Sequence, residues 1–112
     1  VGYEYFNLDD CWQTDRVYDT QVIIPDSVRF PSGMKSLADW LHNKTFKFGI
    51  YTAAHQYTCQ GRYGSYMHEY IDVNTYCEWG VNYIKVDNCG GTKYPQSNTS
   101  WIKFRQGIEQ CY

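Results

Sequence analysis

The sequence predicts an α/β fold in which short strands alternate with amphipathic helices. Three runs rich in aromatic or β-branched residues have the composition of strands: 3–8, 46–51 and 81–86. A stripe of apolar residues at helical spacing follows each run, within 33–44, 66–77 and 101–111. This order, strand then helix three times, indicates parallel strands that are joined by right-handed crossovers.

Each predicted strand has one polar and one apolar face, because side chains alternate along a strand. The polar face carries Tyr5, Asn7, Asp9, Gly49, Tyr51, Lys85 and Asp87. The apolar face carries Phe6, Leu8, Phe48, Ile50, Ile84 and Val86. Polar groups that gather at the carboxyl ends of strands favour a closed barrel with a site there over an open doubly wound sheet. Gly90-Gly91 lacks the remaining spacing of a dinucleotide-binding turn.

Each predicted helix has an apolar stripe. The stripes are Met34, Leu37, Ala38 and Leu41; then Tyr66, Tyr70, Val73 and Cys77; then Trp101, Phe104, Ile108 and Cys111. Gly80 is the expected C-cap of the second helix, and Asn98 or Thr99 the expected N-cap of the third. Residues 13–31 exceed the usual two to six residues of such a connection, so we expect a loop that shapes the rim of the site.

The chain is too short to close a barrel. Eight strand–helix units take about 250 residues, whereas this chain has 112. Three units alone would leave two open sheet edges. The sequence therefore predicts that residues 1–112 form part of one (β/α)8 barrel, without a second domain.

Charge and hydropathy exclude several classes of function. The formal net charge is −2 and no run of Lys or Arg occurs, which argues against nucleic acid as a partner. No stretch reaches the roughly 18 apolar residues of a membrane span. The start of the chain lacks the pattern of a signal peptide, so we expect it to begin in mid-fold or after processing.

Five cysteines indicate an oxidising compartment. They are Cys11, Cys59, Cys77, Cys89 and Cys111, and their odd number leaves at least one without a partner. Asn43 and Asn98 each begin an Asn-x-Ser/Thr sequon, which agrees with a secretory route. No Cys-x-x-Cys pair occurs and the histidines are scattered, so no metal is predicted.

Two motifs at strand ends carry the candidate chemistry. Asp9-Asp10-Cys11-Trp12 has a bland alternative as a turn or cap, and Lys85 with Asp87 has one as a buried structural ion pair. Three carboxylates, a lysine and Tyr51 would nevertheless converge if the strands are neighbours. Carboxylates beside aromatic rings are the chemistry of sugar recognition and glycoside cleavage.

A longer series of motifs resembles a known family. The segments NLDDCW, RFPSGMKSLADWLHNKTFKFGIY, TCQGRYGSY and EWGVNYIKVDNC are similar, in unbroken order, to the melibiase-type alpha-galactosidases of glycoside hydrolase family 27. The resemblance runs from about residue 2 to residue 91. It implies a (β/α)8 barrel, of which this chain supplies strands two to four with their following helices.

The resemblance implies roles for individual residues. Asp87 matches the catalytic nucleophile, and Lys85 matches the lysine that bonds the sugar. Asp9 and Asp10 match the pair that grips its outer hydroxyls, Tyr51 matches the aromatic residue at the end of strand three, and Cys59 with Cys89 matches a disulfide that borders the pocket. The family's acid/base matches no residue here, so the fragment is expected to be inactive by itself. No cofactor is implied, since two carboxylates suffice for the reaction.

The chain departs from the family pattern at a few positions. Ala53 or Ala54 and His55 replace an acidic residue and a glycine, so the resemblance does not predict the conformation of the loop near Cys59. Cys11 would pair with an upstream cysteine, whereas Cys77 and Cys111 either pair across adjacent helices or stay as buried thiols.

The expected function is that of a retaining exo-glycosidase for terminal alpha-linked galactose. Alpha-N-acetylgalactosaminidase activity and a non-catalytic galactose-binding relative are the alternatives. The expected partner is the galactoside alone, without nucleic acid or membrane, with a homodimer of the full-length form as one option. The expected location is secreted or lysosomal/vacuolar.

Overall fold

Three parallel strands form the central sheet of this computed structural model, which describes residues 2–89 and 98–111. The strands are β1 (Tyr5–Asn7), β4 (Lys47–Ala53) and β5 (Tyr83–Asp87), in the order β1-β4-β5. Asn7 lies beside Gly49, and Gly49 beside Tyr83. The predicted parallel strands are confirmed, with shorter or shifted bounds. The Gly90-Gly91 pair lies outside the described residues.

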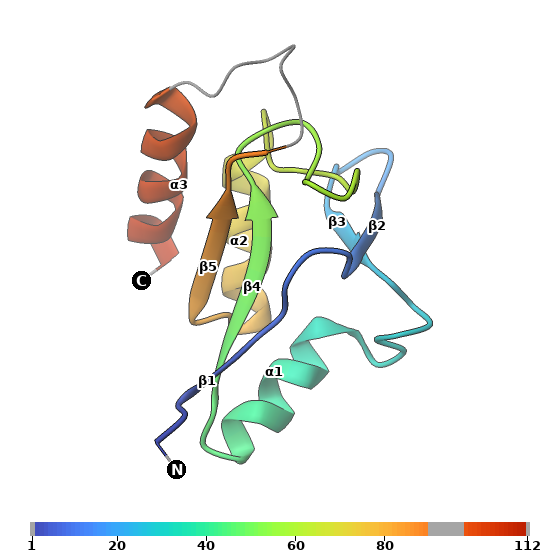
Figure 1. Cartoon of the computed structure of the whole chain (residues 1–112), viewed down its shortest axis with the longest axis vertical. Coiled ribbons are helices and arrows are strands. Elements are labelled where there is room, and N and C mark those ends of the chain that lie inside the picture. The colour runs from blue at the N-terminus through green and yellow to red at the C-terminus, as the bar shows by residue number, and fades with distance from the viewer. Residues whose placement is uncertain (1, 90–97, 112) are drawn as a thin grey trace.

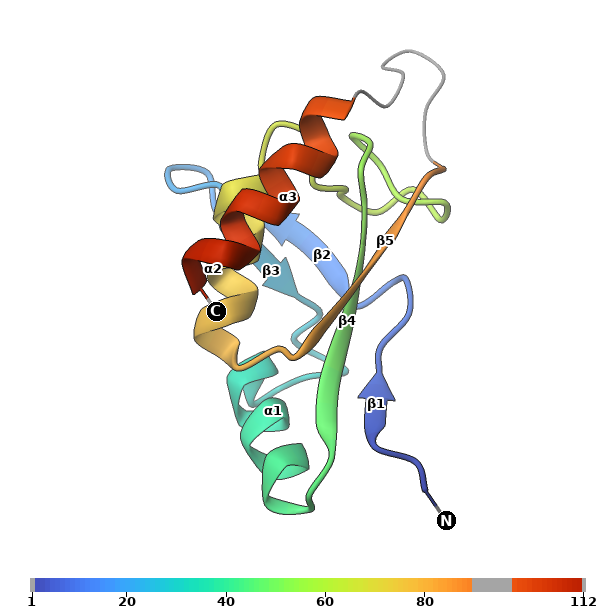
Figure 2. The same cartoon turned by 90° about the vertical axis from the view of Figure 1, so that its left-hand side faces the viewer.

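Three helices cover one face of this sheet (Figures 1 and 2). They are α1 (Gly33–Asn43), α2 (Glu69–Trp79) and α3 (Asn98–Cys111). α1 packs against β4 and α2, while α3 packs against α2. Within the described residues no helix covers the other face of the sheet, the uncovered face, which carries the predicted polar side chains; the Tyr51 side chain on it is nevertheless buried. None of these helices is long and apolar enough to cross a membrane.

The core lies between β4 and the helices. β4 is the central strand and is buried along nearly its whole length. Phe48 and Ile50 meet Met34, Ala38 and Leu41 of α1 in one apolar cluster. Full burial of side chains of this size contributes roughly 1.5–3 kcal/mol each. The predicted stripe of α1 is confirmed, with Leu37 partly buried beside it.

The predicted stripe of α2 is partly wrong. The helix begins at Glu69 rather than near Tyr66, and Tyr70 is exposed. Its buried face carries two acidic residues, Glu69 and Asp72, together with Val73. Counting apolar residues missed these carboxylates because their burial depends on partners from distant segments. The predicted end is confirmed, since Gly80 caps the helix with a positive φ of 87°.

α3 uses only part of its predicted stripe. Phe104 is buried against Val73 and Ala54, whereas Trp101 and Ile108 are exposed. Gly107 lies so close to α2 that an added Cβ would sit 3.1 Å from Val73 Cβ. Close approach of the two helices therefore depends on a residue that the apolar pattern ignores.

The segment expected to be a loop contains a hairpin. β2 (Gln13–Arg16) and β3 (Ile23–Pro25) pair antiparallel, so the connection predicted over 13–31 contains two strands that the prediction did not indicate. The hairpin is fastened to the core by buried Ile23 and by Arg16, which bonds Asp72 of α2. Those contacts are long-range, which is why local composition did not indicate them.

Candidate active site

The candidate residues meet at the carboxyl ends of the three parallel strands. The register sets Tyr51 beside Lys85 and Ala53 beside Asp87. Asp9 follows the end of β1, the strand that pairs with the other edge of β4. Because alternate residues of β5 point the same way, Lys85 and Asp87 share the uncovered face. The predicted convergence of these groups is confirmed.

Asp87 is held by two hydrogen bonds, one on each carboxylate oxygen. Tyr51 Oη donates to Oδ2 at 3.1 Å, and the Asn88 amide donates to Oδ1 at 2.7 Å. Burial, and then the bond to Asp87, raises the pKa of the Tyr51 hydroxyl above its usual value of 10.0. Tyr51 therefore remains a donor at neutral pH, and the carboxylate has a fixed orientation.

Lys85 pairs with Asp9 rather than with Asp87. Its Nζ lies 3.2 Å from Asp9 Oδ2 and 5.4 Å from the centre of the Tyr51 ring. The side chains of Lys85 and Asp9 are 50% and 73% exposed, so the alternative of a buried Lys85–Asp87 ion pair is wrong. The Asp10 amide, and then Lys85, lowers the pKa of Asp9 below its usual 3.8.

The Asp9–Trp12 motif is a turn that also presents carboxylates. The Asp10 amide donates to Asp9 Oδ1 at 2.8 Å, and the Cys11 amide donates to Asp10 Oδ1 at 2.7 Å. Cys11 has a positive φ of 77°, a conformation that non-glycine residues adopt at a cost. Buried Trp12 anchors the turn by donating to the Tyr51 carbonyl. The turn and the sugar grip are thus compatible interpretations.

Two disulfides are present among the described residues. One joins Cys59 to Cys89, with Cα atoms 5.1 Å apart, and Cys59 Sγ lies 3.3 Å from Asp87 Oδ2. These sulfurs and the carboxylate are close enough for a metal site, but the disulfide removes both thiolates. The second joins Cys77 to Cys111, which decides between the two alternatives predicted for that pair. Cys11 forms no disulfide within the described part of the chain.

His55 is a site residue that sequence reasoning noted only as a departure. It is buried, and its Nε2 lies 2.9 Å from Asn88 Oδ1. This contact ties the segment after β4 to the residue that follows Asp87. The fit is tight, because a Cβ on Gly64 would lie 2.0 Å from the His55 carbonyl oxygen. The sequence contains no signal for this role of His55, which is visible only in its contact with Asn88.

Asn7 and Gly49 form a second feature that the polar alternation did not indicate. A Cβ on Gly49 would lie 1.9 Å from Asn7 Oδ1. The glycine in β4 therefore leaves room for the Asn7 side chain to cross the uncovered face of the sheet. The sequence predicts that both residues lie on this face. It does not show that the Asn7 side chain fills the space that a side chain at position 49 would need.

Comparisons with known proteins agree with this geometry. The family described as Alpha galactosidase A matches residues 1–111. An alpha-galactosidase A from Cellvibrio japonicus is 52% identical over 111 residues, which are 99% of this chain and 27% of that protein. This chain therefore spans about a quarter of the length of that relative.

Solved structures extend the likeness to the backbone. The alfa-galactosidase from Saccharomyces cerevisiae with raffinose has a TM-score of 0.87 at 34% identity, over 98% of this chain and 25% of that one. Alpha-galactosidase I from Mortierella vinacea has a TM-score of 0.88 at 34% identity, over 98% and 29%. The predicted partial (β/α)8 barrel is thereby confirmed. With this backbone and a family match over nearly its whole length, the chain belongs to the Alpha galactosidase A family.

Proposed function

We propose that the chain is part of a retaining exo-glycosidase that hydrolyses terminal alpha-linked galactose. The observation that carries this proposal is the placement of Asp87, whose two oxygens are held by Tyr51 and the Asn88 amide at the carboxyl end of β5. A nucleophilic carboxylate needs a fixed orientation under the anomeric carbon. The relatives' names and the raffinose of the yeast structure support galactosides as substrates.

The other site residues would grip the sugar. Asp9 and Asp10 offer carboxylate acceptors to its hydroxyls, and Lys85 offers a cationic donor. Asp10 Oδ2 also accepts from the Gln60 amide at 3.0 Å, so the loop that carries Cys59 is tied to the same turn. The Cys59–Cys89 disulfide would form a rigid border of the pocket. The acid/base that retention needs about 5–5.5 Å from the nucleophile is not assigned to this chain.

We further propose that the protein is located in an oxidising environment, either secreted or lysosomal/vacuolar. Two disulfides among the described residues support it. Asn43 ends α1 and is exposed, as the acceptor of a glycan must be. The side chain of Asn98 lies outside the described part, so its sequon stays a sequence prediction.

The test is hydrolysis of a chromogenic α-galactoside by the full-length protein that carries this chain. Asp87→Asn should lower kcat by about 10³-fold or more, because the amide cannot attack the anomeric carbon. The matched control is Asp39→Asn, since the Asp39 side chain on α1 is 60% exposed and pairs only with Lys35 in the described residues. The control should keep full activity.

Each alternative has its own outcome. Faster cleavage of the N-acetyl-α-galactosaminide would replace the proposed specificity with the related one. A folded wild-type protein that binds galactose without cleaving either substrate would identify a non-catalytic binder. Full activity of Asp87→Asn would refute the assignment of the nucleophile.

A further inference from the structure

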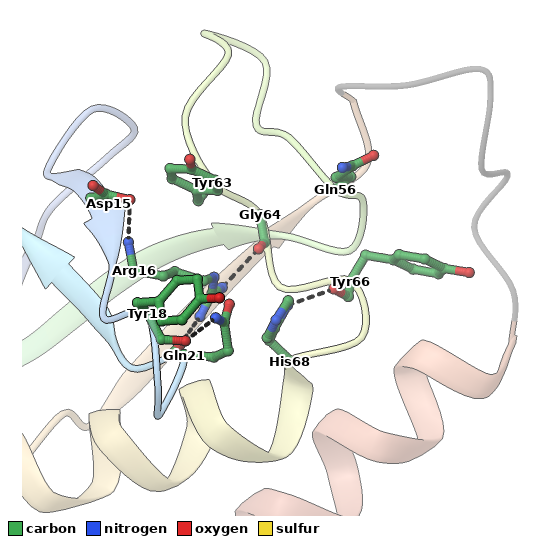
Figure 3. A pocket seen from close by; sticks show the side chains of 9 residues that line it. All are labelled: Asp15, Arg16, Tyr18, Gln21, Gln56, Tyr63, Gly64, Tyr66 and His68. Carbon is green, nitrogen blue, oxygen red and sulfur yellow. Dashed lines mark hydrogen bonds between the residues drawn. The ribbon is translucent and has the colours of Figure 1, made fainter.

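A hollow of about 370 Å³ lies on the far side of the loop that borders the candidate active site. Residues 56–68 of that loop and the β2–β3 hairpin form its walls (Figure 3). The loop has two sides, because Cys59 and Gln60 contact Asp87 and Asp10 while Tyr63 and Gly64 line the hollow. Its size falls within the range of about 300–1,000 Å³ typical of small-molecule sites.

Aromatic rings and amides dominate the lining. The rings belong to Tyr18 of the hairpin and to Tyr63 of the loop, and the amides to Gln21 and Gln56. The Tyr66 ring points away from the hollow (Figure 3). Tyr18 is 90% exposed and Tyr63 is 40% exposed, so both rings present area to a ligand. Rings that stack on an apolar sugar face, beside amides that bond hydroxyls, suit a saccharide.

The positive charge of Arg16, which lines the hollow, is neutralised by a buried carboxylate. Arg16 donates to both carboxylate oxygens of Asp72 at 2.7 Å, and to the carbonyls of Gln21 and Gly64. The side chains of Arg16 and Asp72 are only 6% and 1% exposed. A guanidinium engaged in this way has little capacity left for an anion. Asp15 adds an exposed carboxylate to the lining, whose Oδ1 accepts from the Arg16 amide at 2.7 Å. This carboxylate can accept from hydroxyls and repels anions, so the ligand chemistry that fits is a neutral, hydroxyl-bearing one.

Hydrogen bonds hold the loop side of the hollow in place. Buried Gln13 donates to the Tyr63 carbonyl at 3.3 Å. The backbones of Tyr57 and Tyr63 form an antiparallel β-bridge within the loop. On the far side His68 Nδ1 donates to the Tyr66 carbonyl at 2.9 Å, which leaves Nε2 as the acceptor of the neutral ring. Preformed walls reduce the entropic cost of binding.

We propose that this hollow is a second saccharide-binding site, which takes a neutral hexopyranose unit apart from the galactose at Asp87. The unit belongs either to the same oligosaccharide or to a separate carbohydrate chain. The site deepens the proposed function and rests on it only for the kinetic experiment below. The rings of Tyr18 and Tyr63 provide the stacking surfaces.

The first experiment is a binding titration in which the galactose site is already occupied and cannot contribute. The full-length Asp87→Asn protein, saturated with galactose, is titrated with mannotetraose by calorimetry. Tyr18→Ala and Tyr63→Ala should each weaken binding about tenfold. Trp40→Ala is the matched control, because Trp40 is an exposed ring on α1 outside the hollow, and it should leave binding unchanged. Equal melting temperatures show that the variants remain folded.

The second experiment compares KM values in the active protein. If the unit belongs to the substrate itself, the same two variants raise KM about tenfold for galactosyl-oligosaccharides and leave it unchanged for p-nitrophenyl α-galactoside. Weaker binding in the titration alone shows that the hollow binds a separate carbohydrate chain. A higher KM for the oligosaccharides shows that the hollow binds part of the substrate. Unchanged results in both experiments overturn the site. Failure of the wild type to cleave the small galactoside refutes only the proposed function, because the titration still decides the hollow.

Discussion

Asp9 owes its acidity to its neighbour in the chain and to the lysine it faces. The hydrogen bond from the Asp10 amide is the largest single cause of its lowered pKa, and the hydrogen bond and the charge of Lys85 add to it. Because the folded pKa lies below 3.8, Asp9 stays ionised as the pH falls through that value, and its pairing is lost only as the pH falls through its own lower pKa. The Asp9–Lys85 pair therefore persists in mild acid.

A substitution of Lys85 tests this order of causes. In Lys85→Met, the pKa of Asp9 should rise without reaching its usual value, because the Asp10 amide still donates to Oδ1. The measurement is an NMR titration of the Asp9 carboxyl carbon in the full-length protein. Lys35→Met, which removes an exposed partner of Asp39, should not move it. A full return to the usual pKa would show that Lys85 dominates.

At the scale of elements, the β2–β3 hairpin is joined to α2 by one buried ion pair. Asp72 accepts from Arg16 and also from Ser65 Oγ at 2.6 Å. Ser65 Oγ in turn lies 2.6 Å from Thr52 Oγ1 of β4. A hairpin, a loop, a strand and a helix thus share one polar network in the interior, and each group in it depends on the others for its hydrogen bonds.

Removal of Arg16 should destabilise the fold strongly. Arg16→Met leaves the Asp72 carboxylate buried without its cation, which costs about 3–5 kcal/mol of unfolding free energy. Urea denaturation of the full-length protein measures it. Arg105→Met removes an exposed pair, whose side chains are 81% and 61% exposed, and should change stability by about 0.5 kcal/mol or less. Equal effects of the two substitutions would contradict the structural role of the buried pair.

At the scale of the molecule, two overlapping cross-links bind the C-terminal half together. The Cys59–Cys89 bond spans 30 residues and the Cys77–Cys111 bond spans 34. The first fixes the loop beside Asp87 to the end of β5, and the second joins α2 to α3. Together they restrict the unfolded chain from residue 59 to residue 111.

The helix cross-link should stabilise the protein without affecting its chemistry. Cys77→Ser with Cys111→Ser should lower the unfolding free energy by about 3–4 kcal/mol, the loop entropy expected for this span. Activity on a small galactoside at low temperature should be unchanged, because neither cysteine contacts Asp87. Asn74→Ser, on the exposed face of α2, is the control in the same denaturation series. A loss of activity in a fully folded double variant would place this bond in the catalytic machinery.

The sequence by itself determined that strands and helices alternate, that the strands are parallel, and that Lys85 and Asp87 share one face of their strand. Period-two alternation and apolar stripes are local signals, and parallel crossover rules extend them to neighbouring strands. The stripe of α1 and the cap at Gly80 followed from the same local rules. The resemblance predicted the Cys59–Cys89 disulfide, which the structure contains, and the role of Asp87 as the nucleophile, which stays a prediction.

Only the tertiary structure decided which groups pair. It joined Lys85 to Asp9 instead of Asp87, buried Asp72 beside Arg16, and closed Cys77 onto Cys111. It also turned the expected loop into a hairpin and formed the hollow beside it. These outcomes depend on contacts between residues far apart in the chain, where burial is favourable only once a distant partner supplies the hydrogen bonds or the opposite charge.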